Sequence, residues 1–187
     1  MRILVLTLAV LGSAFAGPVG LDPSTFVDVS SGSATVSGAV GTGHQVWNFT
    51  AWAGNSITLD IDVTAQLQGT VSRDDDTELY LFDSVGHQLA YDDDGGEGMS
   101  SLISDYLAGY SGTYYAVVTT WAGARNRPSF DANGILTGWP DVGASNVEYN
   151  LTISGVAPPP SEVPEPGSVA LLLGGLGALA AFGRRVR

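Results

Sequence analysis

The feature that most constrains the fold is a series of short, strand-like runs separated by turns rich in Gly, Asn and Ser. The clearest run covers residues 56–63 and alternates strictly, which places Ile57, Leu59, Ile61 and Val63 on one face and polar residues on the other. Seven runs are rich in β-branched and aromatic residues: Ala34–Val40, Gln45–Trp52, Ser56–Val63, Glu78–Asp83, Gln88–Tyr91, Thr113–Thr120 and Val147–Ser154. Runs of this length and spacing predict an all-β, antiparallel β-sandwich. Residues 101–110 are ambiguous.

Residues 1–16 contain the three parts of a signal peptide in the expected order. Arg2 gives the positive start, an apolar run follows, and Ala14 and Ala16 fit the small-x-small rule for cleavage before Gly17. The apolar run is too short to span a membrane. A buried N-terminal strand is the alternative, but the order of the three parts favours a removable signal peptide.

The C-terminal region divides into a Pro-rich linker, residues 158–167, and an apolar segment with a basic end, residues 168–187. The linker is expected to be extended and stiff. An apolar helix of about 16 residues reaches roughly 24 Å, short of the ~30 Å hydrocarbon core, and snorkelling Arg side chains make up part of the difference. Arg184, Arg185 and Arg187 favour the cytoplasmic side. We therefore expect one transmembrane helix, with the sandwich domain outside the membrane.

The linker contains Val163, Pro164, Glu165 and Pro166, followed by the short apolar segment and the Arg cluster. This arrangement resembles the PEP-CTERM sorting signal of Gram-negative bacteria. The resemblance implies a temporary inner-membrane anchor that an exosortase, a membrane-embedded cysteine protease, recognises and cleaves near the motif. It also implies a final location at the cell surface or outside the cell, often together with extracellular polysaccharide. An ordinary tail anchor is the alternative, but it has no reason to carry this motif.

The runs at Asp76–Asp94 and Gly112–Val118 have a further resemblance. They are similar to the bacterial pre-peptidase C-terminal domain, and the likeness extends over residues 34–154. It implies a jelly-roll-like β-sandwich of the kind attached to secreted proteins, often proteases. Residues 122–144 depart from the family pattern as an insertion containing Gly and Pro, in which Asn133-Gly134 predicts a turn.

The region between the two end segments, residues 17–157, is predicted to be one domain, and it is strongly acidic. It holds seventeen Asp and Glu residues against three Arg, a net charge of -14. Such a surface repels phosphate backbones, so nucleic acid is not expected as a partner. It attracts cations or basic surfaces, although solubility alone also explains the acidity. The chain has no Cys, which excludes thiol catalysis and thiolate metal sites.

The acidic residues concentrate at one end of a predicted hairpin. If Asp83 pairs with Gln88, then Glu78 faces Asp93, and the carboxylates before and after the hairpin meet at one edge of the sheet. Facing like charges destabilise a sheet, and Ca²⁺, which binds about six to eight oxygen atoms, would relieve the repulsion. The predicted calcium ligands are Asp74, Asp76, Asp92 and Asp94. The alternative is a solvated acidic rim, screened by salt.

The sequence is compatible with three functions. The one it favours is that of a non-catalytic surface or matrix protein. The second is a carbohydrate-binding module for extracellular polysaccharide, which would use exposed rings. Its candidate residues are Trp47 and Trp121, both predicted to lie in the core, and Trp52 and Trp139, which precede turns. The third is a secreted hydrolase. His44 and His87 are better explained by a strand entrance and a turn than by a catalytic triad.

Overall fold

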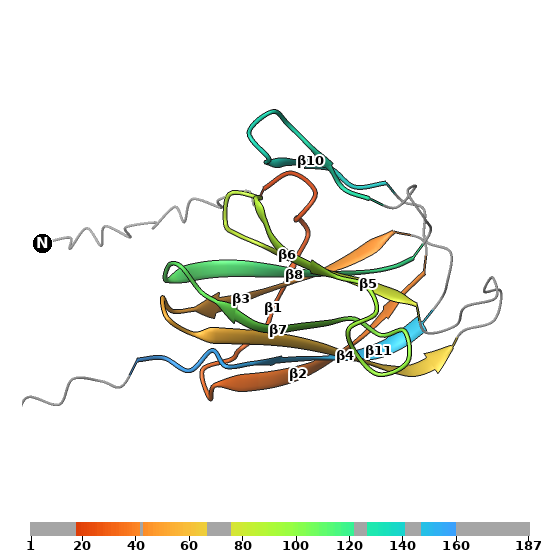
Figure 1. Ribbon diagram of the computed structural model, residues 1–187, viewed down its shortest axis with the longest axis horizontal. Coiled ribbons are helices and arrows are strands. Elements are labelled where there is room, and N and C mark those ends of the chain that lie inside the picture. The colour runs from red at the N-terminus through yellow and green to blue at the C-terminus, as the bar shows by residue number, and fades with distance from the viewer. Residues whose placement is uncertain (1–17, 42, 67–75, 122–126, 141–146, 160–187) are drawn as a thin grey trace, which may run out of the picture.

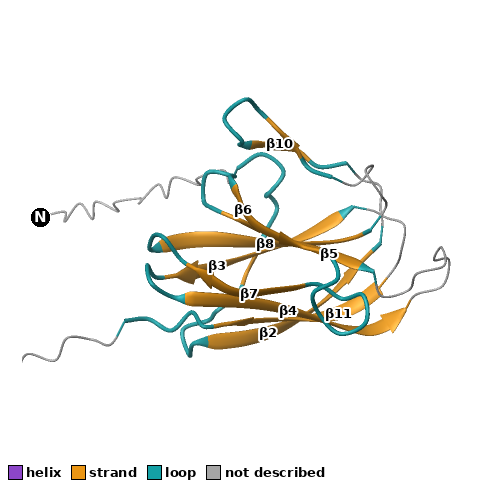
Figure 2. Ribbon diagram, viewed as in Figure 1, coloured by secondary structure: helices purple, strands orange, loops and turns teal. Residues whose placement is uncertain are grey.

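The computed structural model describes residues 18–41, 43–66, 76–121, 127–140 and 147–159, and this part of the chain is all-β (Figures 1 and 2). One sheet has the strand order β1 (Thr25–Phe26), β3 (His44–Ala51), β8 (Gly112–Thr120), β5 (Thr77–Phe82) and β6 (Gln88–Asp92). The other has the order β2 (Ser33–Val40), β11 (Val147–Ser154), β4 (Ser56–Gln66) and β7 (Leu102–Leu107). A small hairpin joins β9 (Ser129–Phe130) to β10 (Leu136–Gly138).

All seven predicted strands are present, with ends that differ by at most a few residues from the sequence prediction. The ambiguous segment, residues 101–110, contains the edge strand β7. Neighbouring strands pair antiparallel, as predicted, with one exception: β1 runs parallel to β3. The strands pack in two layers, with the five-stranded sheet above the four-stranded sheet in the view of Figure 1.

The main core lies between the two sheets. The predicted alternation of β4 is confirmed, because Ile57, Leu59 and Ile61 are buried there while Asp60 and Asp62 are exposed. The facing sheet contributes alternate residues of β3, β5 and β8 to the same core. Burial of this apolar surface is the main term that stabilises the sandwich.

The five-stranded sheet is also covered on its outer face, so every residue of β5 is buried. Tyr80 and Phe82 point to this outer face and pack with Leu136 from β10 and Leu21 from the N-terminal segment. The β9–β10 hairpin lies within residues 122–144, the segment expected to be an insertion. Its turn is the predicted Asn133-Gly134 turn, where the Asp131 carboxylate accepts hydrogen bonds from the main chain.

Several predicted features lie outside the described residues. They are the signal peptide with Ala14 and Ala16, Asp74, the sorting motif Val163, Pro164, Glu165 and Pro166, and the segment 168–187 with Arg184, Arg185 and Arg187. In the part that is described, no helix has the length and apolar character needed to cross a membrane.

Candidate functional site

The pairing of β5 with β6 brings the acidic residues to one edge of the five-stranded sheet. The predicted register holds along the strands, in the pairs Leu79–Asp92, Tyr80–Tyr91 and Leu81–Ala90. It is wrong next to the turn, because a bulge pairs Gln88 with Phe82 instead of Asp83. The Asp83 amide donates instead to the carbonyl of His87. The extra residue of the bulge, Leu89, shifts the register by one, so the predicted pairing applies only on the side of the bulge away from the turn.

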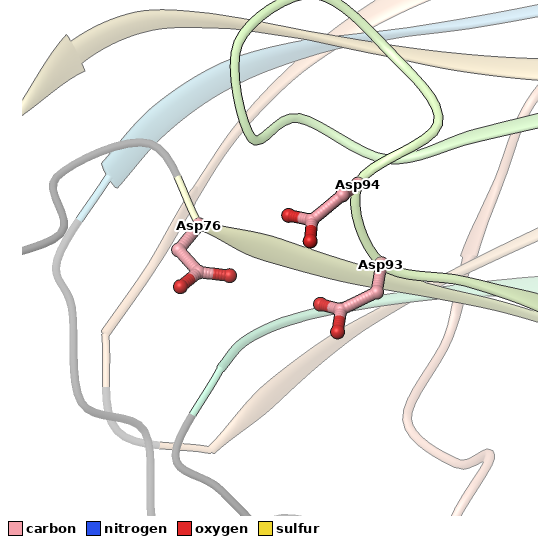
Figure 3. A group of neighbouring side chains, drawn as sticks. All are labelled: Asp76, Asp93 and Asp94. Atoms are coloured by element: carbon pink, nitrogen blue, oxygen red, sulfur yellow. The ribbon is translucent and has the colours of Figure 1, made fainter.

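Three carboxylates form a candidate metal centre at this edge. One oxygen atom from each of Asp76, Asp93 and Asp94 lies within 4.8 Å of the others. Figure 3 shows their origin: Asp76 directly precedes β5, and Asp93 and Asp94 directly follow β6. Asp76 is buried, Asp93 is half-buried and Asp94 is exposed, so the group extends from the protein interior to solvent.

Asp92 does not belong to this group in the described residues, although the sequence pattern selected it as a ligand. Its carboxylate accepts hydrogen bonds of 2.8 Å from the amides of Gly95 and Leu102. It therefore fixes the loop that carries Asp93 and Asp94. Asp93 takes the place predicted for Asp92, because the Asp92 carboxylate is held by the amides of Gly95 and Leu102. The predicted hairpin already placed Asp93 opposite Glu78. This pairing was the signal in the sequence that could have identified Asp93 as a ligand.

The loop is held against β5 by buried hydroxyl groups. The Ser101 amide donates to the Thr77 hydroxyl at 2.9 Å, and the Ser101 hydroxyl lies 2.7 Å from the Thr77 carbonyl and 3.0 Å from the Asp93 carbonyl. Both side chains are fully buried. These contacts fix the main chain beside Asp76 relative to the main chain of Asp93, and so position the three carboxylates.

Glu78 is a fourth acidic residue at this edge, and it is only 1% exposed. Its Oε1 accepts a hydrogen bond of 3.1 Å from the Tyr91 hydroxyl, whereas Oε2 has no hydrogen-bond partner among the described residues. Burial is the main cause that raises the pKa of Glu78 to about 7, and the charges of Asp93 and Asp76 add to it. The Tyr91 hydrogen bond and the nearby Arg127 act in the opposite direction.

The pKa of Asp93 is also raised, first by burial and then by the charges of Asp94 and Asp92. Raised pKa values of two neighbouring acids show that their charged forms are disfavoured without a counter-ion. Oxygen atoms bound to Ca²⁺ lie 2.3–2.6 Å from the ion, so ligands on opposite sides lie about 5 Å apart. The spacing of Asp76, Asp93 and Asp94 therefore allows one ion to contact all three.

The two histidines have structural contacts. His87 Nδ1 lies 2.9 Å from Oδ2 of Asp83 in the hairpin turn, which agrees with its predicted role as a turn residue. His44 begins β3, as predicted, and its Nε2 lies 3.2 Å from the Gly20 carbonyl.

The four tryptophans are distributed over different parts of the fold. Trp47 is buried in the main core, as predicted, and its Nε1 donates to the Tyr149 hydroxyl. The prediction for Trp121 is wrong: it follows the last residue of β8 and is 42% exposed. Trp139 packs against Tyr80 on the outer face of the five-stranded sheet, and Trp52 is half-buried at the end of β3.

Comparisons with solved structures give distant similarities. The chain is similar to the pre-peptidase C-terminal domain of a collagenase from Bacillus anthracis, with 12% identity and a TM-score of 0.43, over 70% of this chain and 94% of that chain. It is also similar to PliG, a periplasmic inhibitor of g-type lysozyme, from Salmonella Typhimurium (17% identity, TM-score 0.37, 70% of this chain and 96% of that chain). The same inhibitor from Aeromonas hydrophila gives 17% identity and a TM-score of 0.36, over 74% of this chain and 98% of that chain.

No curated protein matches the sequence. Residues 162–187 match the family model of the PEP-CTERM protein-sorting motif. This match covers the segment in which the sequence showed the Pro-Glu-Pro motif, the apolar stretch and the Arg cluster. The chain thus carries a PEP-CTERM protein-sorting motif, which implies processing by an exosortase and export to the envelope or surface of a Gram-negative bacterium.

Proposed function

We propose that this chain is a non-catalytic protein of the cell surface or extracellular matrix, with a β-sandwich that binds Ca²⁺ at Asp76, Asp93 and Asp94. The sorting motif supports export to the cell surface, and the three carboxylates at the acidic edge support the binding of Ca²⁺. In this proposal residues 1–16 direct export and residues 168–187 anchor the chain in the inner membrane until the exosortase cleaves it.

The observation that carries the calcium proposal is the convergence of three carboxylates beside a buried fourth. Asp76, Asp93 and Asp94 each offer one oxygen within a span that a single calcium ion can bridge. Glu78 adds a buried carboxyl group, whose raised pKa reflects burial and the charges of Asp93 and Asp76. Ca²⁺ needs about six to eight oxygen ligands, so water and main-chain carbonyls supply the others.

Calcium bound here acts as a structural cross-link. Asp76 precedes β5, whereas Asp93 and Asp94 belong to the loop after β6, so one ion joins two segments that otherwise repel each other. A ligand that binds only the native state raises its stability in proportion to RT ln(1 + [L]/Kd). A surface protein in a calcium-containing medium would gain stability in this way without any catalytic step.

The test is thermal unfolding of the full chain in excess EDTA and then in millimolar Ca²⁺. At a concentration about 100-fold above Kd, the ion adds about 2.7 kcal/mol, which is a rise of several degrees in Tm. Asp76→Asn and Asp94→Asn are expected to abolish the rise. The matched control is Asp62→Asn, an exposed carboxylate on β4, which is expected to keep it.

Matched Mg²⁺ is expected to give a smaller rise, because it requires six ligands in nearly ideal octahedral positions at shorter distances. If Ca²⁺ changes the Tm of the native chain no more than it changes that of Asp76→Asn, the acidic edge is a solvated rim and the calcium proposal is wrong.

A further inference from the structure

A pocket of about 170 Å³ opens on the outer face of the five-stranded sheet, at the side of the β9–β10 hairpin. Two strands of the sheet and the segment that leads into the hairpin form its walls. Its lining residues are Tyr80, Gln88, Tyr91, Arg127, Pro128 and Phe130. This pocket is distinct from the three carboxylates. Tyr91 connects the two sites, because it lines the pocket and its hydroxyl group donates a hydrogen bond to Glu78.

The walls are aromatic rings that pack on the outer face of the five-stranded sheet, in an apolar cluster formed by Leu21, Val46, Tyr80, Phe82, Val117 and Leu136. The ring centroids of Tyr80 and Tyr91 lie 4.6 Å apart with a tilt of 47°. Trp139 packs edge-on against Tyr80 at 4.8 Å. Phe130 contacts Phe82 at 6.4 Å and is still 38% exposed. The pocket therefore has rigid apolar walls and one aromatic ring that remains accessible to a ligand.

Two polar side chains supply directional contacts at the same pocket. Gln88 has an amide that both donates and accepts, and Arg127 has a planar group with five donors. Both are exposed, and within the described part of the chain neither makes a hydrogen bond to another side chain. A ligand with hydroxyl groups can form hydrogen bonds with both side chains, which a purely apolar ligand cannot do.

We propose that this pocket binds one neutral sugar ring, with the apolar face of the ring against Phe130 and the tyrosines and its hydroxyl groups on Gln88 and Arg127. The volume equals about six water molecules at roughly 30 Å³ each, which suits a single ring that extends partly into solvent. An anionic ligand is disfavoured, because Glu78 and Asp93 lie close by and residues 17–157 carry a net charge of -14.

A free sugar and a ring at the end of a polysaccharide share this chemistry. The inference goes beyond the calcium proposal and does not depend on it, so the two fail separately. Binding measured in EDTA tests the pocket alone, whereas the effect of Ca²⁺ on Tm tests the acidic edge alone.

The experiment is a titration of the full chain in EDTA with the methyl glycosides of glucose, galactose, mannose and N-acetylglucosamine, followed by saturation-transfer NMR and calorimetry. We expect saturable binding of at least one of them. Phe130→Ala is expected to weaken it about five- to tenfold, since an aromatic contact contributes on the order of 1 kcal/mol. Gln88→Ala is expected to weaken it by a similar factor. Phe26→Ala is the matched control, because Phe26 is 62% exposed on β1, at the opposite edge of the same sheet.

A second arm uses polysaccharides built from the sugar that binds. Binding of the polymer at the same pocket, weakened by Gln88→Ala as the glycoside is, identifies chain ends or side branches as the source. Binding of the glycoside alone identifies a free sugar. Gln88 is exposed, so this variant decides the question even if Phe130→Ala fails to fold. The proposal is overturned if no glycoside binds saturably, or if both pocket variants bind as tightly as Phe26→Ala.

Discussion

The hydroxyl oxygens of Thr77 and Ser101, which are 24 positions apart in the chain, lie 3.0 Å from each other in the protein interior. Thr77 is the first residue of β5 and Ser101 directly precedes β7, so this pair joins the two sheets at the acidic edge. It also fixes Asp76, the neighbour of Thr77, relative to Asp93, whose carbonyl lies 3.0 Å from the Ser101 hydroxyl. The geometry of the candidate metal centre thus depends on two uncharged side chains.

Ser101→Ala is expected to lower the free energy of unfolding by about 1–3 kcal/mol, because it leaves the carbonyls of Thr77 and Asp93 without their hydroxyl partner in the protein interior. It is also expected to weaken calcium binding. Urea unfolding in EDTA measures the first effect and calorimetry the second. Ser84→Ala, at an exposed turn position, should change neither. Equal stability of the two variants would show that the Ser101 hydroxyl is not needed.

Glu78→Gln is expected to stabilise the metal-free protein at pH 8 but not near pH 4.5. The folded-state pKa of Glu78 is about 7, above its ordinary value of 4.5, so the folded state binds more protons in this range and loses stability as pH rises from 4.5 to 7. Glutamine removes this loss and still accepts the hydrogen bond from Tyr91.

The expected gain at pH 8 is on the order of 1–3 kcal/mol, measured by urea unfolding in EDTA. Glu148→Gln, at an exposed position of β11, is the control and should show no such pH dependence. A gain of the same size at both pH values would contradict the assigned cause.

Gly38→Ala is expected to destabilise the fold by about 2 kcal/mol or more, because overpacking a filled interior is costly. An added Cβ would lie 2.6 Å from the hydroxyl oxygen of Tyr149, which accepts from Trp47 Nε1 at 2.9 Å and donates to Gln45 at 2.7 Å. Near-UV circular dichroism and urea unfolding report the change around Trp47. Gly109→Ala has open space around its Cβ and is expected to stay within about 0.5 kcal/mol of the native chain.

Asp83→Ala is expected to cost about 1–3 kcal/mol at pH 7, because one carboxylate oxygen accepts three amide hydrogen bonds, from Val85, Gly86 and His87. Burial acts to raise the pKa of Asp83, but these hydrogen bonds outweigh it and lower the pKa below 3.8. The carboxylate therefore contributes stability above its ordinary pKa, and this contribution is lost as pH falls through the lowered value.

The difference between Asp83→Ala and the native chain should accordingly shrink below about pH 4, as followed by thermal unfolding from pH 2 to 7. Asp62→Ala, at an exposed position of β4, serves as the control. A difference that stays constant over this range would show that the charge of Asp83 does not matter.

The positions of the strands follow from local sequence. The alternation of β4 and the turns on either side of it specify one buried face, so the inward direction of Ile57, Leu59 and Ile61 was predictable. The same is true of the Asn133-Gly134 turn and of the register between β5 and β6 beyond the bulge. The outer-face burial of Tyr80 was not predictable, because it depends on a hairpin that begins nearly fifty residues later.

For this protein the sequence by itself determined the all-β class, the strand positions and the sorting motif, because each depends on residues that are close together in the chain. Only the tertiary structure decided that Asp93 joins Asp76 and Asp94 while Asp92 holds the loop, and that Trp121 is exposed while Trp139 is packed. These outcomes depend on hydrogen bonds and burial between distant segments. Local periodicity fixes the direction of a side chain from its own strand, but the opposing segment decides what that side chain meets.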